Sequence, residues 1–111
     1  YYSDSGNNNN PTLHFPCVLL IKPGRSLIFK NLKSREVSLV SEKNGPVLSM
    51  SFQDFDYLGI WAKSKAPYVC IEPWLGIADS IDSDGKLIHK EGIILLESKK
   101  KTQKSYTITI H

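Results

Sequence analysis

Short apolar runs separated by turn-forming residues make up most of this chain. Over 48–52 the apolar residues alternate with serines, which is the period of a half-buried β-strand. Over 57–63 an apolar set falls on one face, and Gly59 and Trp61 fall on the other. Strands are predicted at 17–22, 26–30, 36–41, 48–52, 57–63, 68–72, 92–97 and 104–110. Such a series predicts an all-β chain, built as an antiparallel β-sandwich or barrel.

Turn signals set the limits of several strands. Asn44-Gly45 is a strong hairpin signal, because both residues tolerate the left-handed backbone of a tight turn. One stretch, 74–81, has apolar residues at the spacing of a helix. However, Pro73 precedes it and Gly76 interrupts it, so we expect a loop with at most one helical turn.

The first residues differ from the rest of the chain. Residues 1–12 are polar and turn-forming, and they have too little apolar surface to offset the cost of ordering. We therefore expect 1–12 to be a flexible segment and 13–111 to be one folded unit. Because the chain starts at Tyr1 without a methionine or a signal peptide, we expect a processed product or a fragment.

The composition argues against two kinds of partner. Of the 111 residues, 41% are apolar and 23% are charged, which is typical of a soluble globular domain. The net charge of +3 is too small to indicate a nucleic-acid partner. The apolar runs are much shorter than the roughly 18 residues of a membrane span, so no membrane partner is expected.

The two cysteines, Cys17 and Cys70, lie far apart in the sequence. Two such residues do not make a disulfide framework, and the cysteine and histidine spacings of zinc sites are absent. We expect both to be buried thiols in a reducing compartment, the cytoplasm, and we expect no metal site.

One carboxylate stands out at the end of a predicted strand. In the run 68–72, Glu72 shares a face with Tyr68 and Cys70, and Trp74 follows shortly after. A carboxylate beside an aromatic ring can act as a base whose pKa is raised by desolvation. The alternative is a solvent-facing glutamate at a strand end, and the local pattern leaves both open.

Two longer motifs carry a resemblance to a known family. They read Asp-Tyr-Leu-Gly-Ile-Trp-Ala-Lys at 56–63 and Ala-Pro-Tyr-Val-Cys-Ile-Glu-Pro-Trp-Leu-Gly-Ile-Ala-Asp-Ser at 66–80. With weaker matches over 26–110, the chain resembles the carboxy-terminal part of the aldose 1-epimerase (galactose mutarotase-like) family, and its LacX-like branch in particular. The resemblance implies that 13–111 is the carboxy-terminal portion of an antiparallel β-sandwich of galactose mutarotase type.

The resemblance also implies an activity. Enzymes of this family interconvert the α and β anomers of hexoses, without a metal or an organic cofactor. A glutamate takes the proton of the C1 hydroxyl, a histidine protonates the ring oxygen, and the opened sugar closes on its other face. The glutamate of the family's motif falls on Glu72, which is therefore the expected catalytic base.

Three departures from the family leave enzyme activity open. A complete family domain is more than twice as long, and its acid histidine lies upstream of what this chain contains. The three histidines here, His14, His89 and His111, match none of the family positions, and we expect each at the surface. In addition, Arg25 stands where relatives tend to carry an acidic residue.

Other residues have weaker functional interpretations. Trp74 is expected either to stack on a sugar ring or to pack in the core. Asp79 either helps to shape the sugar pocket or fixes a turn through its own backbone. Trp61 is expected in the core, and the lysine run 99–101 is expected to keep a strand edge soluble.

Three functions therefore remain open. The first is aldose 1-epimerase-like mutarotation with Glu72 as base, incomplete without upstream residues. The alternatives are a hexose-6-phosphate 1-epimerase-like enzyme, which would need a cationic pocket, and a non-catalytic carbohydrate-binding module. The expected partners are a hexose or hexose phosphate and, because half a sandwich exposes apolar edges, the missing amino-terminal portion or a second copy.

Overall fold

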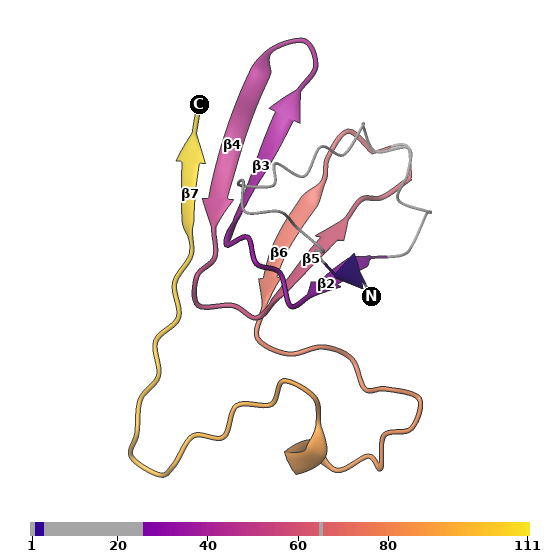
Figure 1. The fold of residues 1–111 in the computed structure, drawn as a ribbon, viewed down its shortest axis with the longest axis vertical. Coiled ribbons are helices and arrows are strands. Elements are labelled where there is room, and N and C mark those ends of the chain that lie inside the picture. The colour runs from indigo at the N-terminus through magenta and orange to yellow at the C-terminus, as the bar shows by residue number, and fades with distance from the viewer. Residues whose placement is uncertain (1, 4–25, 65) are drawn as a thin grey trace.

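The computed structural model forms two β-sheets (Figure 1). It describes residues 2–3, 26–64 and 66–111. The predicted strand at 17–22 and the histidine His14 lie outside the described residues. Of the predicted flexible segment 1–12, the structure describes Tyr2–Ser3, which is the short strand β1.

The first sheet has the strand order β1, β2, β5, β6. Within it, β2 (Leu27–Lys30), β5 (Tyr57–Trp61) and β6 (Cys70–Trp74) are antiparallel to one another, and β1 joins β2 in parallel. The register between β5 and β6 places Gly59 directly opposite Glu72. Among the described strands, β6 is therefore an edge of this sheet.

The second sheet has the strand order β3, β4, β7. Its β3 (Glu36–Ser41) and β4 (Gly45–Ser51) form the hairpin predicted from Asn44-Gly45, and Gly45 has the expected positive φ of 78°. The last strand, β7 (Thr107–Ile110), pairs antiparallel with the other side of β4. Residues from the middle and the end of the chain thus share one sheet.

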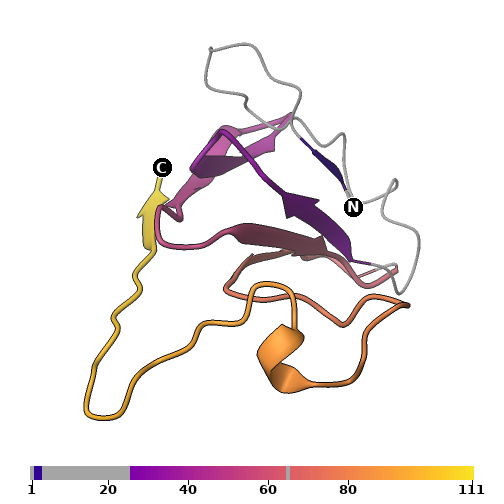
Figure 2. The ribbon, with the colours of Figure 1, turned by 60° about the horizontal axis from the view of Figure 1, so that its bottom comes forward.

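The two sheets form layers around one apolar core (Figure 2). Leu58 and Phe52 are fully enclosed there, with 0% and 1% of their surface exposed. The core members are Phe29, Leu32, Val37, Met50, Phe52, Leu58, Ile60 and Ala62. Both sheets contribute to this set, and the predicted all-β antiparallel sandwich is confirmed.

The alternation along β5 separates the core face of the first sheet from its outer face. Leu58 and Ile60 point into the core, as predicted. Because successive residues of a strand point to opposite faces, Gly59 and Trp61 lie on the outer face. The pairing of Gly59 with Glu72 then puts Glu72 on the outer face too. Figure 2 shows the chain that follows β6 running along this side of the sheet.

The predicted strand at 92–97 is wrong. Those residues form no strand in the described part of the chain, although residues 93–96 are all large and apolar. A strand needs a neighbour for its backbone hydrogen bonds, and none of the described strands pairs with this segment. The final strand is also shorter than the predicted 104–110, because β4 pairs only with Thr107–Ile110.

The segment between β6 and β7 has little regular structure (Figure 1). As predicted, 74–81 does not form a helix. The 3₁₀ turn η1 (Leu87–His89) comes later in the segment. No helix in the described residues has the length and apolar composition needed to cross a bilayer.

Candidate functional site

Glu72 and Trp74 lie side by side on the outer face of β6. They are two residues apart in one strand, so both side chains project to the same face of the sheet. Glu72 is paired with Gly59 and Trp74 with Tyr57. Both side chains are half-buried, so Glu72 is not the fully solvent-facing glutamate of the alternative interpretation.

Gly59 provides the space that these two side chains occupy. A Cβ atom built on Gly59 would lie 2.9 Å from Cζ2 of Trp74 and 3.4 Å from Oε2 of Glu72. The indole and the carboxylate therefore both reach the surface left open by the missing side chain of Gly59. Contacts under 3.0 Å are not tolerated by packed carbon atoms, so any larger residue here displaces Trp74.

The carboxylate of Glu72 is not neutralised within the described structure. No described residue forms a hydrogen bond or an ion pair with it, whereas two carboxylates later in the chain, Asp79 and Glu91, are both ion-paired. An ionised carboxylate offers two acceptor oxygens. Glu72 is thus a half-buried acceptor next to an aromatic ring, which is a suitable arrangement for a polyhydroxylated ligand.

Trp61 lies on this same outer face, and not in the core where it was expected. It pairs with Cys70 on β6 and packs against Tyr68, with 6.1 Å between the ring centroids and 53° between the planes. Cys70 is a free and half-buried thiol, less enclosed than predicted. The alternation along 57–63 already placed Trp61 opposite the core residues, so this neighbour of Glu72 could have been found from the sequence.

The chain after η1 is fastened to the outer face beside Trp74. Nζ of Lys30 donates hydrogen bonds to both carboxylate oxygens of Glu91, at 2.8 and 2.9 Å. The next residue, Gly92, lies against Tyr57, the direct partner of Trp74 in the sheet. This ion pair and this contact hold the returning chain next to the Glu72–Trp74 pair.

Asp79 is placed away from Glu72, in the loop that follows β6. Its Oδ1 accepts a hydrogen bond of 2.5 Å from Nζ of Lys90, where a contact with its own turn was the alternative expected. It helps to line an open cavity of about 230 Å³, together with other carboxylates, two serines and His89. Neither Glu72 nor Trp74 lines this cavity. Asp79 is therefore linked to the outer face indirectly: it pairs with Lys90, and the next residue, Glu91, pairs with Lys30 on β2.

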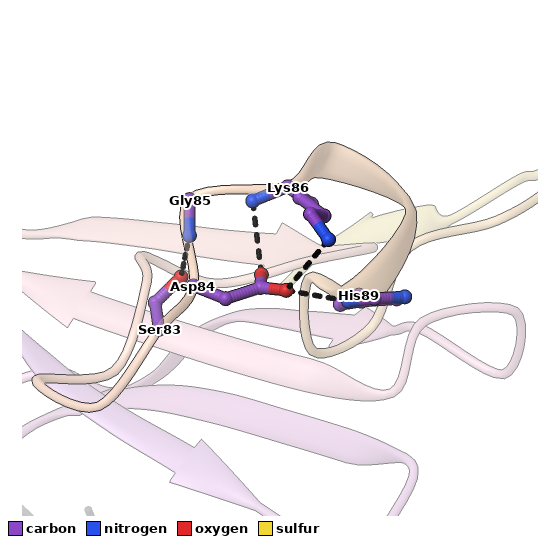
Figure 3. Close-up of polar contacts among 5 residues, drawn as sticks. All are labelled: Ser83, Asp84, Gly85, Lys86 and His89. Atoms are coloured by element: carbon purple, nitrogen blue, oxygen red, sulfur yellow. Dashed lines mark hydrogen bonds and ion pairs between the residues drawn. The ribbon is translucent and has the colours of Figure 1, made fainter.

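His89 belongs to the same loop and is engaged locally (Figure 3). Its Nδ1 lies 2.7 Å from Oδ2 of Asp84. The backbone N–H of Lys86 and then His89 lower the pKa of Asp84. With 60% of its side chain exposed, His89 is the surface residue that was predicted. His111 is also exposed, and its Nε2 lies 2.9 Å from Oγ of Ser49.

Neither described histidine therefore joins Glu72. The described residues contain no group of three or more histidine, cysteine, aspartate or glutamate side chains able to hold a metal ion. The chemistry available at Glu72 from these residues is that of a proton acceptor beside an aromatic surface.

Comparisons with known proteins identify relatives of this chain. It is 36% identical over 86 residues to the chromosomal protein LacX of Lactococcus lactis subsp. lactis. It is 35% identical over 86 residues to the plasmid protein LacX of the same organism. The chain is similar to the LacX proteins over this region. The matched region is 77% of this chain.

The LacX-like chain spans only 29% of the length of these two relatives. No family model matches the sequence. No solved structure matches it either. The resemblance to the LacX-like branch, noticed from the motifs at 56–63 and 66–80, is confirmed, whereas the name LacX does not itself state a reaction.

Proposed function

We propose that this chain carries the base and an aromatic binding surface of an aldose 1-epimerase-like hexose site. The observation that supports this most strongly is the Glu72 carboxylate, half-buried beside Trp74 over Gly59 and without a counter-ion among the described residues. The LacX-like sequence and the all-β fold agree with a carbohydrate-related role. The free thiol of Cys70 fits a reducing compartment such as the cytoplasm.

A hexose offers two complementary features to such a site. One face of its ring presents C–H groups that pack well on an aromatic surface such as Trp74. Its C1 hydroxyl can donate a hydrogen bond to a carboxylate oxygen of Glu72. In mutarotation Glu72 takes the C1 hydroxyl proton while an acid protonates the ring oxygen, the C1–O5 bond breaks, and closure on the other face reverses both transfers.

The acid for the ring oxygen is not among the residues around Glu72. His89 lies near Asp84 and His111 near Ser49, and neither is on the outer face with Glu72. This favours a second candidate function, a carbohydrate-binding module that retains the base and lacks the acid. In both cases the ligand is a hexose at Glu72 and Trp74.

Hexose-6-phosphate epimerisation has less support. Lys30, on β2, is ion-paired with Glu91. Arg35 donates to the carbonyl oxygen of Phe55. The described residues therefore bring no cationic pocket to Glu72, and Lys22 and Arg25 lie outside the described residues.

Polarimetry of freshly dissolved α-D-galactose or α-D-glucose tests the proposal. Because the acid is absent, the purified chain is expected to speed the change in optical rotation only weakly, and Glu72→Gln is expected to abolish this acceleration, since the base carries the activity that remains. Glu42→Gln, at an exposed position in the β3–β4 turn, is the matched control and should keep the rate.

The possible results separate the candidate functions. A rate retained by Glu72→Gln would show that Glu72 is not the base. No acceleration by the unmodified chain would rule out mutarotation by this chain. The remaining candidate, a carbohydrate-binding module, would then be tested by measuring hexose binding at Trp74.

A further inference from the structure

The outer face of the first sheet carries a second aromatic pair beside Glu72. The paired residues on this face are Tyr57 with Trp74, Gly59 with Glu72, and Trp61 with Cys70. Neighbouring pairs lie about 6.6 Å apart along the strands. The carboxylate of Glu72 is therefore in the middle row, with the row of Trp74 on one side and the row of Trp61 on the other.

Tyr68 completes the aromatic surface at Trp61. It comes two residues before Cys70, and its ring centroid lies 6.1 Å from that of Trp61, at an angle of 53° between the planes. Tyr68 is 45% exposed and Trp61 is half-buried, so both rings are accessible in part. Next to Glu72 on this face, β6 carries only the small thiol of Cys70. The two rings thus form an apolar surface one row away from the carboxylate.

The Trp74 indole extends toward this second surface. Because a Cβ atom on Gly59 would lie 2.9 Å from Cζ2 of Trp74, the indole leans out of its own row and over Gly59. Among the paired outer-face residues of β5 and β6, Glu72 alone carries a charge. Trp74 and Trp61 therefore border one aromatic stretch of the outer face, with the Glu72 carboxylate between them.

The position of C1 determines which part of a ligand reaches the second surface. In the proposed hexose site the sugar ring packs on Trp74, and its C1 end lies at Glu72. A group attached to the C1 oxygen then extends beyond Glu72 and away from Trp74, in the direction of Trp61. A planar aryl group, or the C–H face of a second sugar ring, packs favourably on aromatic side chains.

We propose that Trp61 and Tyr68 bind the group attached to C1 of a glycoside, so that the site holds glycosides more tightly than free hexoses. The proposal rests on the proposed placement of the hexose at Glu72 and Trp74. The attached group is an aryl group or a second sugar ring, because each offers an apolar face to the two aromatic side chains.

Such a ligand is bound without being opened. The C1 oxygen of a glycoside carries no proton, so Glu72 has none to remove there and the ring does not open by general base catalysis. The carboxylate accepts a hydrogen bond from the neighbouring C2 hydroxyl instead. Of the two candidate functions, glycoside binding therefore favours the carbohydrate-binding module.

NMR titrations of the 111-residue chain with methyl β-D-glucoside, phenyl β-D-glucoside and methyl β-cellobioside test the proposal, because these ligands differ in the group at C1. We expect the phenyl glucoside and the cellobioside to bind about three- to tenfold more tightly than the methyl glucoside, which is the effect of one aromatic contact. They should shift the indole N–H signals of both Trp61 and Trp74, whereas the methyl glucoside should shift chiefly that of Trp74. A gain confined to the phenyl glucoside assigns the surface to aryl groups, and a gain confined to the cellobioside assigns it to a second sugar.

Substitutions at Tyr68 separate ring stacking from general packing. Tyr68→Leu should abolish the gain and leave the affinity for the methyl glucoside within about twofold, whereas Tyr68→Phe should keep the gain. Tyr106→Leu is the matched control, because this tyrosine is 54% exposed and packs against Phe55, a neighbour of the core cluster. Circular dichroism checks that each variant is folded.

Equal affinities for the three ligands, without movement of the Trp61 signal, would overturn the proposal. A gain that persists in Tyr68→Leu would overturn it as well. If D-glucose and the methyl glucoside still shift the Trp74 signal in these cases, the hexose site at Glu72 stands and only the glycoside inference fails. If no sugar shifts the Trp74 signal, both fail.

Discussion

Glu91 accepts hydrogen bonds from Lys30 through both of its carboxylate oxygens, at 2.8 and 2.9 Å, and so joins the loop after η1 to the strand β2. Lys30 is mostly covered, with 20% of its side chain exposed, while 49% of the Glu91 side chain is exposed. The pair is therefore partly screened by water, and its main effect is to locate the loop beside the outer face.

Replacing Glu91 by glutamine should release this loop without unfolding the protein. We expect the free energy of unfolding to fall by less than about 1 kcal/mol, as for other solvent-screened pairs. Amide exchange at 90–92 should become faster, as measured by NMR or mass spectrometry. Glu97→Gln, an exposed carboxylate without an ion pair among the described residues, is the control. A loss of stability well above this range would mean that the pair also supports the core.

Gly92 is expected to be the most sensitive glycine of the loop. Its φ is +76°, and a Cβ there would lie 2.9 Å from both Cε2 and the hydroxyl oxygen of Tyr57. Gly85 has a similar φ of +73°, but a Cβ there meets nothing within 4 Å. Both alanine variants lose about 1 kcal/mol or more from backbone strain, and Gly92→Ala should lose roughly a further 1–3 kcal/mol from overpacking against Tyr57. Equal urea midpoints for the two variants would contradict this packing.

The attachment of Ser105 to Asp54 should depend on pH. Oδ2 of Asp54 accepts hydrogen bonds from the backbone N–H of Ser105 at 2.8 Å and from its hydroxyl at 3.1 Å. These bonds, the backbone one first, lower the pKa of Asp54 below its ordinary value of 3.8. Because the folded-state pKa is the lower one, this attachment stabilises the fold above about pH 3.8 and is lost as the pH falls through the folded-state value.

An NMR titration of the Ser105 amide measures this dependence. Its chemical shift should stay constant above pH 3.8 and move at lower pH, as the carboxylate is protonated. Asp54→Asn should remove the transition, and Asp56→Asn, two residues away, should retain it. A shift that begins near neutral pH would show that another group controls this contact.

Local sequence pattern predicted the parts of this fold that depend on neighbouring residues. The alternation along 57–63 gave the two faces of β5, and Asn44-Gly45 gave the β3–β4 hairpin. Glu72 was identified as a candidate from its place in a motif. The space beside it was not, because the role of Gly59 depends on the register between β5 and β6.

Contacts between distant parts of the chain could not be predicted, because no local sequence pattern indicates them. Lys30 and Glu91 are 61 residues apart, and neither stands out from the other charged residues in the sequence. The pairing of β7 with β4 also joins distant parts of the chain, and no local pattern in the sequence indicates it. Alternation shows which residues are suited to a strand, but it does not show which strand will be the neighbour.

The central claim is that a hexose binds at Glu72 and Trp74 over Gly59. It is tested most directly by an NMR titration with D-galactose and D-glucose that follows the two indole N–H signals. We predict a saturable shift of the Trp74 signal that exceeds that of Trp61. Gly59→Ala should reduce it by displacing Trp74, whereas Gly76→Ala, whose Cβ would meet its nearest atom at an ordinary 3.7 Å, should retain it. A Trp74 signal that does not move at saturating sugar, or that moves equally in Gly59→Ala, would contradict the claim.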